Sequence, residues 1–348
     1  MKKTRLIFSL AFATLLAVGC SKDKENDGGE NPPVSTYTIV NNGNAGVTSI
    51  TDTEDAMALR VVQAVPAVEN VDYPRTVPVL LFFDDKILLS SFEDGGIQVT
   101  QDGNEIGGKV YINEGANGYA IMTFVPTETF TANKNIVVNL TGIQDDGGNE
   151  IEGGVFSLTF DTNEQNMGAF DGNGDFSSTD GVLFLGDGNI INDQSCLSSG
   201  SSYAAITSGD MLVSAGEAIG GASSIMILGE IDSDISSLTF DYNFLSAEFD
   251  EYVGSQFDDS VIMTVVGPNN AYSEFITSVN TVGTAGNTEC ITFQNMPDTG
   301  DDFSGATGWI TKTINFSNVG SPAYVIFTVT DVADQIYSSV LAVDNVSY

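Results

Sequence analysis

The chain has 348 residues, of which 47 are acidic, 11 are basic and none is histidine, giving a net charge of −36. This charge excludes a nucleic-acid surface, which requires clustered Lys and Arg, and it disfavours electrostatic docking on anionic lipid. Without histidine the chain cannot build a Ser-His-Asp triad or most zinc and iron sites. The 37 glycines are typical of turn-rich β structure, and the length leaves room for two domains.

The N-terminus has the pattern of an export signal. Three basic residues precede an apolar run, Leu6–Val18, that is too short to remain as a membrane-spanning helix. Leu16–Cys20 (LAVGC) resembles a lipobox, the site where a bacterial signal peptidase cuts before a diacylated Cys. We therefore expect a lipoprotein signal peptide at residues 1–19 and an acylated Cys20 anchored in outer-membrane lipid. An ordinary secretory signal with an incidental Cys is the alternative.

Residues 20–59 are predicted to be a flexible tether. Ser21–Pro33 is polar, charged and rich in Gly and Pro, a composition that does not build a packed core. Ser21–Glu25 resembles the acidic tag that follows the lipidated Cys in surface-exposed lipoproteins of Bacteroidetes. The resemblance implies display on the cell surface, with the periplasmic face of the outer membrane as the alternative.

Residues 60–162 contain short apolar segments separated by turn signals. The predicted strands are Val77–Phe83, Ile97–Thr100, Lys109–Ile112, Tyr119–Val125, Ile136–Leu140 and Val155–Phe160. Asp102-Gly103-Asn104 is a hairpin signal between the second and third of them. Because no helical period is present, these segments predict an immunoglobulin-like β-sandwich.

The order of these segments resembles the SbsA-type bacterial Ig-like domain first described in S-layer proteins. The matching residues are Leu80–Asp84, Thr123–Pro126, Leu140–Gly142, Asp145–Asn149 and Phe160–Thr162. The resemblance implies a non-catalytic spacer that lifts the rest of the chain off the membrane. Asp145–Asn149 is open to interpretation as a cation loop, but Asp, Gly and Asn are also ordinary turn residues and the turn is favoured.

Residues 171–348 are predicted to form a larger β-sandwich of the jelly-roll type, so the whole chain is expected to be all-β. The predicted strands are Val182–Leu185, Tyr203–Thr207, Ile225–Leu228, Leu238–Phe244, Val261–Val266, Phe275–Thr281, Thr311–Phe316, Tyr324–Asp331 and Val340–Val346. The core between the two sheets is expected to take alternating side chains, such as Phe240, Tyr242 and Phe244, and Tyr324, Ile326 and Thr328.

Cys196 and Cys290 are the only thiols besides Cys20. An even pair in an exported domain predicts a disulfide, which in the chain-entropy model stabilises the fold by about 4 kcal/mol. A catalytic Cys would need a partnering base, and the chain has no His to supply it.

Two segments of this second region resemble the "choice-of-anchor" domains of bacterial surface and secreted proteins. The first comprises Phe244–Val253, Phe257–Asp259 and Val266–Pro268, and the second comprises Thr330–Ser339 and Val343–Val346. The resemblance implies an extracellular jelly roll of adhesin or carbohydrate-binding type. It does not specify a ligand.

Acidic residues dominate the second region, which from Asn163 onward has 25 acidic residues and one basic residue, Lys312. Carboxylates packed without basic partners repel one another unless a hard cation intervenes. We therefore predict calcium binding by a set drawn from Glu248, Asp258, Asp259, Asp331, Asp334 and Asp344. The spacing of Asp171, Asn173 and Asp175 predicts a second candidate loop, although the Gly and Glu of an EF-hand are missing. Capping and turn chemistry is the alternative for both sets.

The function predicted from the sequence is that of a non-enzymatic cell-surface lipoprotein that binds an extracellular glycan or a surface protein. One alternative is a polysaccharide-capture accessory of an outer-membrane uptake system, in which Trp309, Tyr272 and Tyr337 would form a sugar-stacking platform. The other alternative is a glycoside hydrolase or lyase that uses paired carboxylates such as Glu248 and Asp258.

Overall fold

The computed structural model describes residues 37–42, 57–66, 73–93, 95–114, 119–192, 198, 200–208, 223–283, 305–330 and 338–348. The described regular structure is almost entirely β-strand, which confirms the predicted fold class. The helices within these described ranges are the short α1 (Ser90–Glu93), α2 (Val279–Val282) and a 3-10 turn at Glu152–Gly154. Among the described residues, no helix has the length and apolar character needed to cross a bilayer. The expected signal peptide, Cys20, Cys196 and Cys290 lie outside the described residues.

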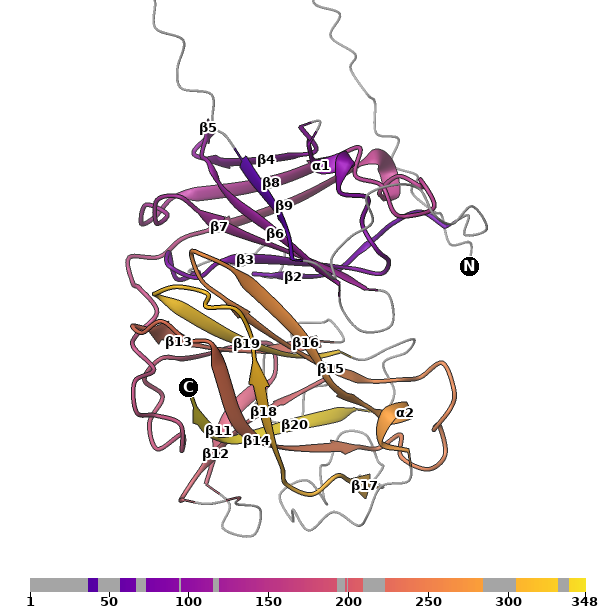
Figure 1. Cartoon of the computed structure of the whole chain (residues 1–348), viewed down its shortest axis with the longest axis vertical. Coiled ribbons are helices and arrows are strands. Elements are labelled where there is room, and N and C mark those ends of the chain that lie inside the picture. The colour runs from indigo at the N-terminus through magenta and orange to yellow at the C-terminus, as the bar shows by residue number, and fades with distance from the viewer. Residues whose placement is uncertain are drawn as a thin grey trace, which may run out of the picture. The chain divides into compact units, whose positions relative to one another are not determined.

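Two sheets form the first sandwich (Figure 1). The strand order of one sheet is β1 (Tyr37–Asn41), β6 (Gly108–Glu114), β7 (Ala120–Pro126), β3 (Val79–Phe83) and β2 (Val61–Val65). The strand order of the other is β5 (Asn104–Glu105), β4 (Ile97–Gln101), β8 (Asn135–Thr141) and β9 (Val155–Asp161).

The hairpin turn forms where the sequence signals it, but β4 pairs there with the two-residue β5, and the segment Lys109–Ile112 lies in β6 of the other sheet. Asp102 and Gly103 have φ angles of 48° and 79°, as a tight hairpin turn requires of both central residues. Strand β1 departs from expectation, because it lies within the predicted tether and pairs in parallel with β6. Leu59 is also buried and bridges to Ile151. Folded structure therefore begins before Arg60.

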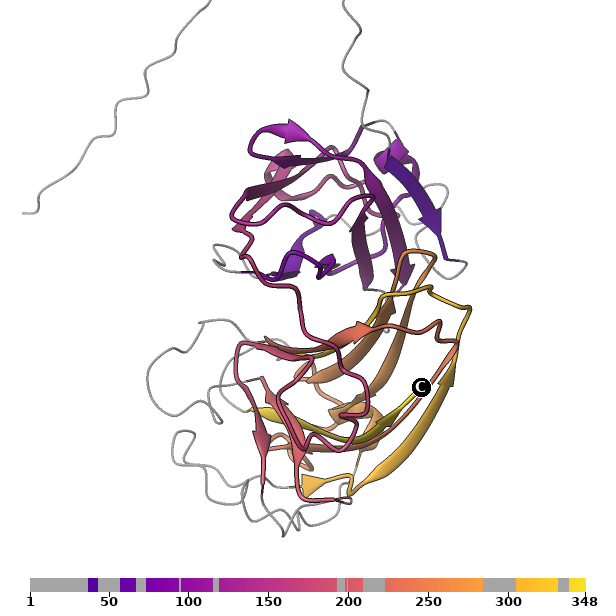
Figure 2. The same ribbon diagram turned by 90° about the vertical axis from the view of Figure 1, so that its left-hand side faces the viewer.

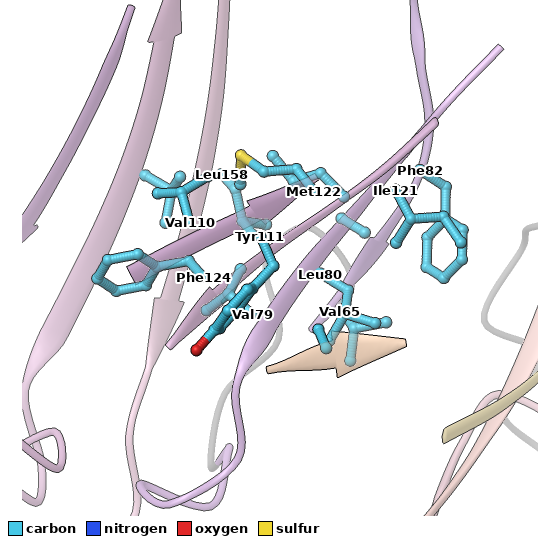
Figure 3. Packing of buried hydrophobic residues seen from close by; sticks show 14 of the residues in the cluster. Val65, Val79, Leu80, Phe82, Val110, Tyr111, Ile121, Met122, Phe124 and Leu158 are labelled. Carbon is cyan, nitrogen blue, oxygen red and sulfur yellow. The ribbon is translucent and has the colours of Figure 1, made fainter. Parts of the chain in front are cut away.

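The core of the first sandwich is built from side chains of its strands, including Val110 of β6 and Met122 and Phe124 of β7 (Figure 3). All five residues of β3 are buried. This pattern indicates that the sheet containing β3 is covered on both faces, since an antiparallel sheet with one wet face alternates between apolar and polar residues.

Two sheets also form the second sandwich (Figure 2). One has the order β10 (Val182–Leu185), β13 (Ser223–Ile231), β19 (Ala323–Thr330), β15 (Ser260–Val266) and β16 (Ala271–Ser278). The other has the order β11 (Gly188–Ile191), β12 (Tyr203–Thr207), β20 (Ser339–Ser347), β14 (Ser237–Ser246) and β17 (Gly305–Ala306), and β18 (Ile310–Asn315) also pairs with β14.

The five-stranded sheet β10-β13-β19-β15-β16 contributes to two cores. Phe327 and its alternating neighbours on β19 join the core of the second sandwich, together with Phe240 and Phe244. Tyr324 and Ile326 instead join the core cluster of the first sandwich. The expectation that both groups share one core was wrong, because with both faces buried the period of two does not specify which core a residue meets.

Candidate functional site

A hollow of about 720 Å³ lies where the edge strands β16 and β18 meet the end of β1. Its lining residues are Asn42, Asn270, Ala271, Tyr272, Asn315, Phe316 and Ser317. The volume falls within the range of roughly 300–1,000 Å³ that is usual for small-molecule sites. None of these lining side chains carries a charge.

Two of the residues that line this hollow are aromatic and pack on each other. Tyr272 is on β16 and Phe316 directly follows β18, and their rings are stacked with centroids 5.7 Å apart and planes 23° apart. Both rings are partly buried against the core of the second sandwich. They therefore present a fixed apolar surface, because a ring packed on one side has little rotamer freedom left to lose on binding.

Charged neighbours fix the Tyr272 ring from behind. Its hydroxyl donates to Glu274 Oε2, and Lys312 Nζ lies 3.4 Å from Glu274 Oε1 and donates to the Phe275 carbonyl at 3.3 Å. Burial, followed by the hydrogen bond and the negative charge of Glu274, raises the pKa of Tyr272 to about 12. The phenol is thus neutral at physiological pH, and Lys312 offsets the charge of the nearby carboxylate.

The rim of the hollow carries amide and hydroxyl groups from three separate parts of the chain. Asn270 follows the turn between β15 and β16, Asn315 ends β18, and Asn42 comes from the end of β1. Within the described part of the chain, no hydrogen bond is made by the side chains of Asn270 and Asn315. Each amide offers two donor hydrogens and an acceptor oxygen. The rim can therefore donate hydrogen bonds to ligand hydroxyl groups and accept hydrogen bonds from them.

Tyr272 and Trp309, two of the three aromatic residues proposed from the sequence as one platform, lie in different places. Tyr272 lies in the hollow, whereas Trp309 packs edge-to-face on Tyr203, with centroids 5.7 Å apart, against the six-stranded sheet. Tyr337 lies outside the described residues. The actual partner of Tyr272 is Phe316, which the sequence placed only as the end of a strand. No local signal identifies it, because the pairing depends on how β16 and β18 meet.

Among the predicted calcium ligands, Glu248 and Asp259 are fully buried. A series of hydrogen bonds through buried serine residues connects them. Asp259 Oδ2 accepts from the Ser208 hydroxyl at 3.1 Å, and Ser208 Oγ accepts from the backbone N–H of Ser339 at 2.8 Å. The series continues from Ser339 to Ser246 at 2.8 Å, and Ser246 Oγ accepts from the Glu248 N–H at 2.9 Å.

Asp258 and Asp344, two further members of that predicted set, make other contacts. Asp258 accepts from the Asn280 backbone N–H at 2.7 Å. Asp344 is buried on β20, five residues beyond Ser339, or about 17 Å along an extended strand. Asp331 and Asp334 lie outside the described residues. Among the described residues, no three acidic or thiol side chains are grouped closely enough to hold a metal.

The Asp171–Asp175 loop makes turn contacts. The Asn173 amide donates to the carbonyls of Ser178 and Asp180 at 2.9 and 3.0 Å, and its oxygen accepts from the Ser178 N–H. Asp175 accepts from the Ser177 N–H, and Asp171 accepts from the Tyr348 hydroxyl. Calcium binding by this loop stays a prediction.

The loop Asp145–Asn149 also has the contacts of a turn. Asp145 accepts from the backbone and side-chain nitrogens of Asn149, at 2.7 and 3.0 Å, and Gly148 has a φ of 83°. The side chain of Asp145 is therefore committed to closing the loop, which agrees with the interpretation favoured from the sequence.

No known protein family matches the chain, and neither does any curated protein. Among solved structures, the carbohydrate-binding module TmCBM61 in complex with beta-1,4-galactotriose is similar at 10% identity and a TM-score of 0.29, over 51% of this chain and 95% of that one. A promiscuous carbohydrate-binding module of the β-sandwich super family is similar at 12% identity and a TM-score of 0.28, over 84% of this chain and 98% of that one. Domains 1–6 of the surface-layer protein SbsC are similar at 11% identity and a TM-score of 0.25, over 80% of this chain and 52% of that one. At such TM-scores these similarities carry no ligand or activity over to this chain.

Proposed function

We propose that this protein is a non-enzymatic, lipid-anchored binding protein of the bacterial cell surface, and that it captures an extracellular glycan in the hollow between β16 and β18. The anchor would be the acylated Cys20, as the lipobox-like sequence predicts. Capture for an outer-membrane uptake system and adhesion to a glycan-bearing surface both use this same binding event.

The stacked pair of Tyr272 and Phe316, surrounded by asparagine amides, is the observation that supports a glycan most directly. One face of a pyranose ring carries C–H groups, which pack on an aromatic ring, while its hydroxyls need donors and acceptors around the edge. The hollow offers both, with the aromatic rings held in place by the Glu274–Lys312 pair. Amphipathic rings of this kind suit ligands that are apolar on one side and wet on the other.

The charge distribution favours a neutral glycan over an acidic one. The lining of the hollow is uncharged, and the chain as a whole carries a net charge of −36. An excess of one sign repels ligands of the same sign over about a Debye length. Uronic-acid and sulfated glycans are therefore expected to bind more weakly than unsubstituted ones.

The burial of Glu248 supports binding without hydrolysis. The alternative enzyme would pair Glu248 with Asp258 across a glycosidic bond. Glu248 is fully buried, and Asp258 is engaged by the Asn280 backbone. A carboxylate sealed beneath the surface cannot protonate a leaving group that remains outside it.

Calcium stabilisation of the second sandwich is a further part of the proposal. Glu248 and Asp259 are wholly buried, and the Asp259 carboxylate accepts from the Ser208 hydroxyl. The sequence beyond Asn163 has no basic residue except Lys312, which pairs with Glu274. Hard cations take oxygen ligands of this kind. Thermal unfolding with millimolar calcium is expected to show a higher midpoint than unfolding with chelator, and an unchanged midpoint would rule this part out.

A glycan array tests the proposed binding. The purified chain is applied to neutral oligosaccharides of glucose, galactose, mannose and xylose and to uronic-acid and sulfated glycans, and the same mixtures are analysed for released sugar. We expect reproducible binding to neutral members without any product. Released sugar would establish an enzyme, and a lack of binding to every member would contradict the proposal.

A further inference from the structure

Side chains of the first sandwich converge on one hairpin of the second. The hairpin is the turn between β15 and β16, and the hydrogen bonds end on its Pro268 and Ala271 carbonyls. The Pro268 carbonyl accepts from Lys109 Nζ at 2.7 Å and from the Tyr111 hydroxyl at 3.0 Å. The Ala271 carbonyl accepts from Asn113 Nδ2 at 3.2 Å and from Asn42 Nδ2. Lys109, Tyr111 and Asn113 alternate along β6, so they project from one face of the strand.

The same hairpin builds one side of the hollow. Asn270, Ala271 and Tyr272 all line it and begin two residues after Pro268. Inside the second sandwich, the hairpin closes through the Gly267 N–H to Asn270 carbonyl bond at 3.0 Å and the Asn269 N–H to Val319 carbonyl bond at 2.8 Å. The position of Tyr272 is thus fixed from one side by its own sandwich and from the other by β6.

Asn42 connects the two roles. It lines the hollow, and its Nδ2 donates to the Ala271 carbonyl and lies 3.5 Å from Asn113 Oδ1. In the described part of the chain its side-chain oxygen accepts no hydrogen bond. That oxygen is therefore an acceptor supplied to the hollow by the first sandwich.

Apolar packing supports this arrangement. Side chains of the five-stranded sheet of the second sandwich lie in the core cluster of the first, among them Ile227, Ile262, Tyr324 and Ile326. Removing apolar side chains such as these from water stabilises the packing of the sheet against the first sandwich. The hairpin is consequently held against β6 by apolar packing as well as by hydrogen bonds.

We propose that the first sandwich is part of the binding site and not only a spacer: Asn42 contacts the glycan, and Lys109 and Tyr111 position the hairpin that carries Tyr272. This inference rests on the proposed glycan binding. The chemical class of ligand is a neutral oligosaccharide, which Asn42 serves as a hydrogen-bond acceptor.

The test measures affinity for the neutral oligosaccharides of the array by titration calorimetry, using the whole chain. Asn42→Ala is expected to weaken binding about tenfold, and the exposed Asn192→Ala is the matched control. Lys109→Met and Tyr111→Phe, which touch no lining position, are expected to weaken binding several-fold, and Lys109→Arg is expected to restore it. Thermal midpoints of all variants check that the fold is intact.

The outcomes separate the two claims. If Tyr272→Ala abolishes binding while Asn42→Ala and Lys109→Met bind as tightly as wild type, this inference is overturned and the glycan site stands. If wild type binds no array member, both claims fail. Loss of affinity in Asn42→Ala and Lys109→Met, with an unchanged midpoint and recovery in Lys109→Arg, supports the inference.

Discussion

Asp241 shows how this acidic chain accommodates a half-buried carboxylate without a cation. Burial alone would raise its pKa, but hydrogen bonds from Ser198, Thr311 and Asn345 outweigh burial, and the pKa of Asp241 is lowered. The donors lie 2.5 to 2.7 Å from its oxygens. Short hydrogen bonds to an ionised acceptor are stronger than neutral ones, so these donors take the place of the missing Lys or Arg.

Asp241→Asn is expected to destabilise the chain by about 1–3 kcal/mol, because it leaves donors without an ionised acceptor. Since the folded-state pKa is depressed, the stabilisation is present above the unfolded pKa of about 3.9 and is lost as the pH falls through the folded value. Urea unfolding at pH 7 and pH 3 checks both points. The variant should lose less stability between these pH values than wild type or the exposed control Asp250→Asn. Equal losses in all three would contradict this explanation.

At the scale of elements, the doubly buried sheet explains why the strands of the second sandwich are so apolar. The residues of β15 are all buried, and so are those of β19 except Thr330. A sheet with one face in water would instead alternate between apolar and polar residues. Along β15 and β19, apolar residues pack alternately in the core of the first sandwich and in the core of the second. Both cores therefore include side chains of this sheet.

Ile326→Ala, on the face that meets the first sandwich, is expected to cost about 2–5 kcal/mol through lost burial and a residual cavity. Ile310→Ala on β18 is the matched control, because Ile310 is 40% exposed and surface truncations usually change stability by less than about 0.5 kcal/mol. Denaturant unfolding measures both variants. If Ile326→Ala were as mild as Ile310→Ala, the face would not be buried in a second core.

Sequence periodicity predicted most strands of both sandwiches but little of the site. Val182–Leu185 and Tyr203–Thr207 form strands with the predicted bounds, since apolar runs flanked by turn residues are local signals. Strand β1 was missed because its parallel pairing with β6 is a long-range contact. The hollow was missed for the same reason: Asn42, Tyr272 and Phe316 are far apart in sequence and meet only through the packing of three strands.

At the scale of the whole molecule, buried tyrosines make stability sensitive to alkali. Burial is the main cause that raises the pKa of Tyr37, Tyr111 and Tyr272 to about 12, and it raises the pKa of Tyr324 further. The folded state therefore keeps these phenols protonated while the unfolded chain ionises near pH 10.

The contribution of these tyrosines to stability should accordingly be fully present below their unfolded pKa of about 10 and be lost as the pH rises through their folded-state pKa of about 12. Urea midpoints from pH 8 to 11.5, followed together with phenolate absorbance, measure this. Phenolate formation that reaches completion near pH 10 without unfolding would show that the rings are not buried.

The central claim is that the stacked rings of Tyr272 and Phe316 bind a neutral glycan, and its most direct test is calorimetric titration of Phe316→Ala. Wild type and the Asn192→Ala control should bind the best neutral oligosaccharide of the array alike, while Phe316→Ala, with its fold confirmed by thermal unfolding, should lose about tenfold or more in affinity, or at least about 1.4 kcal/mol. Equal affinity in wild type and Phe316→Ala would contradict the proposed site.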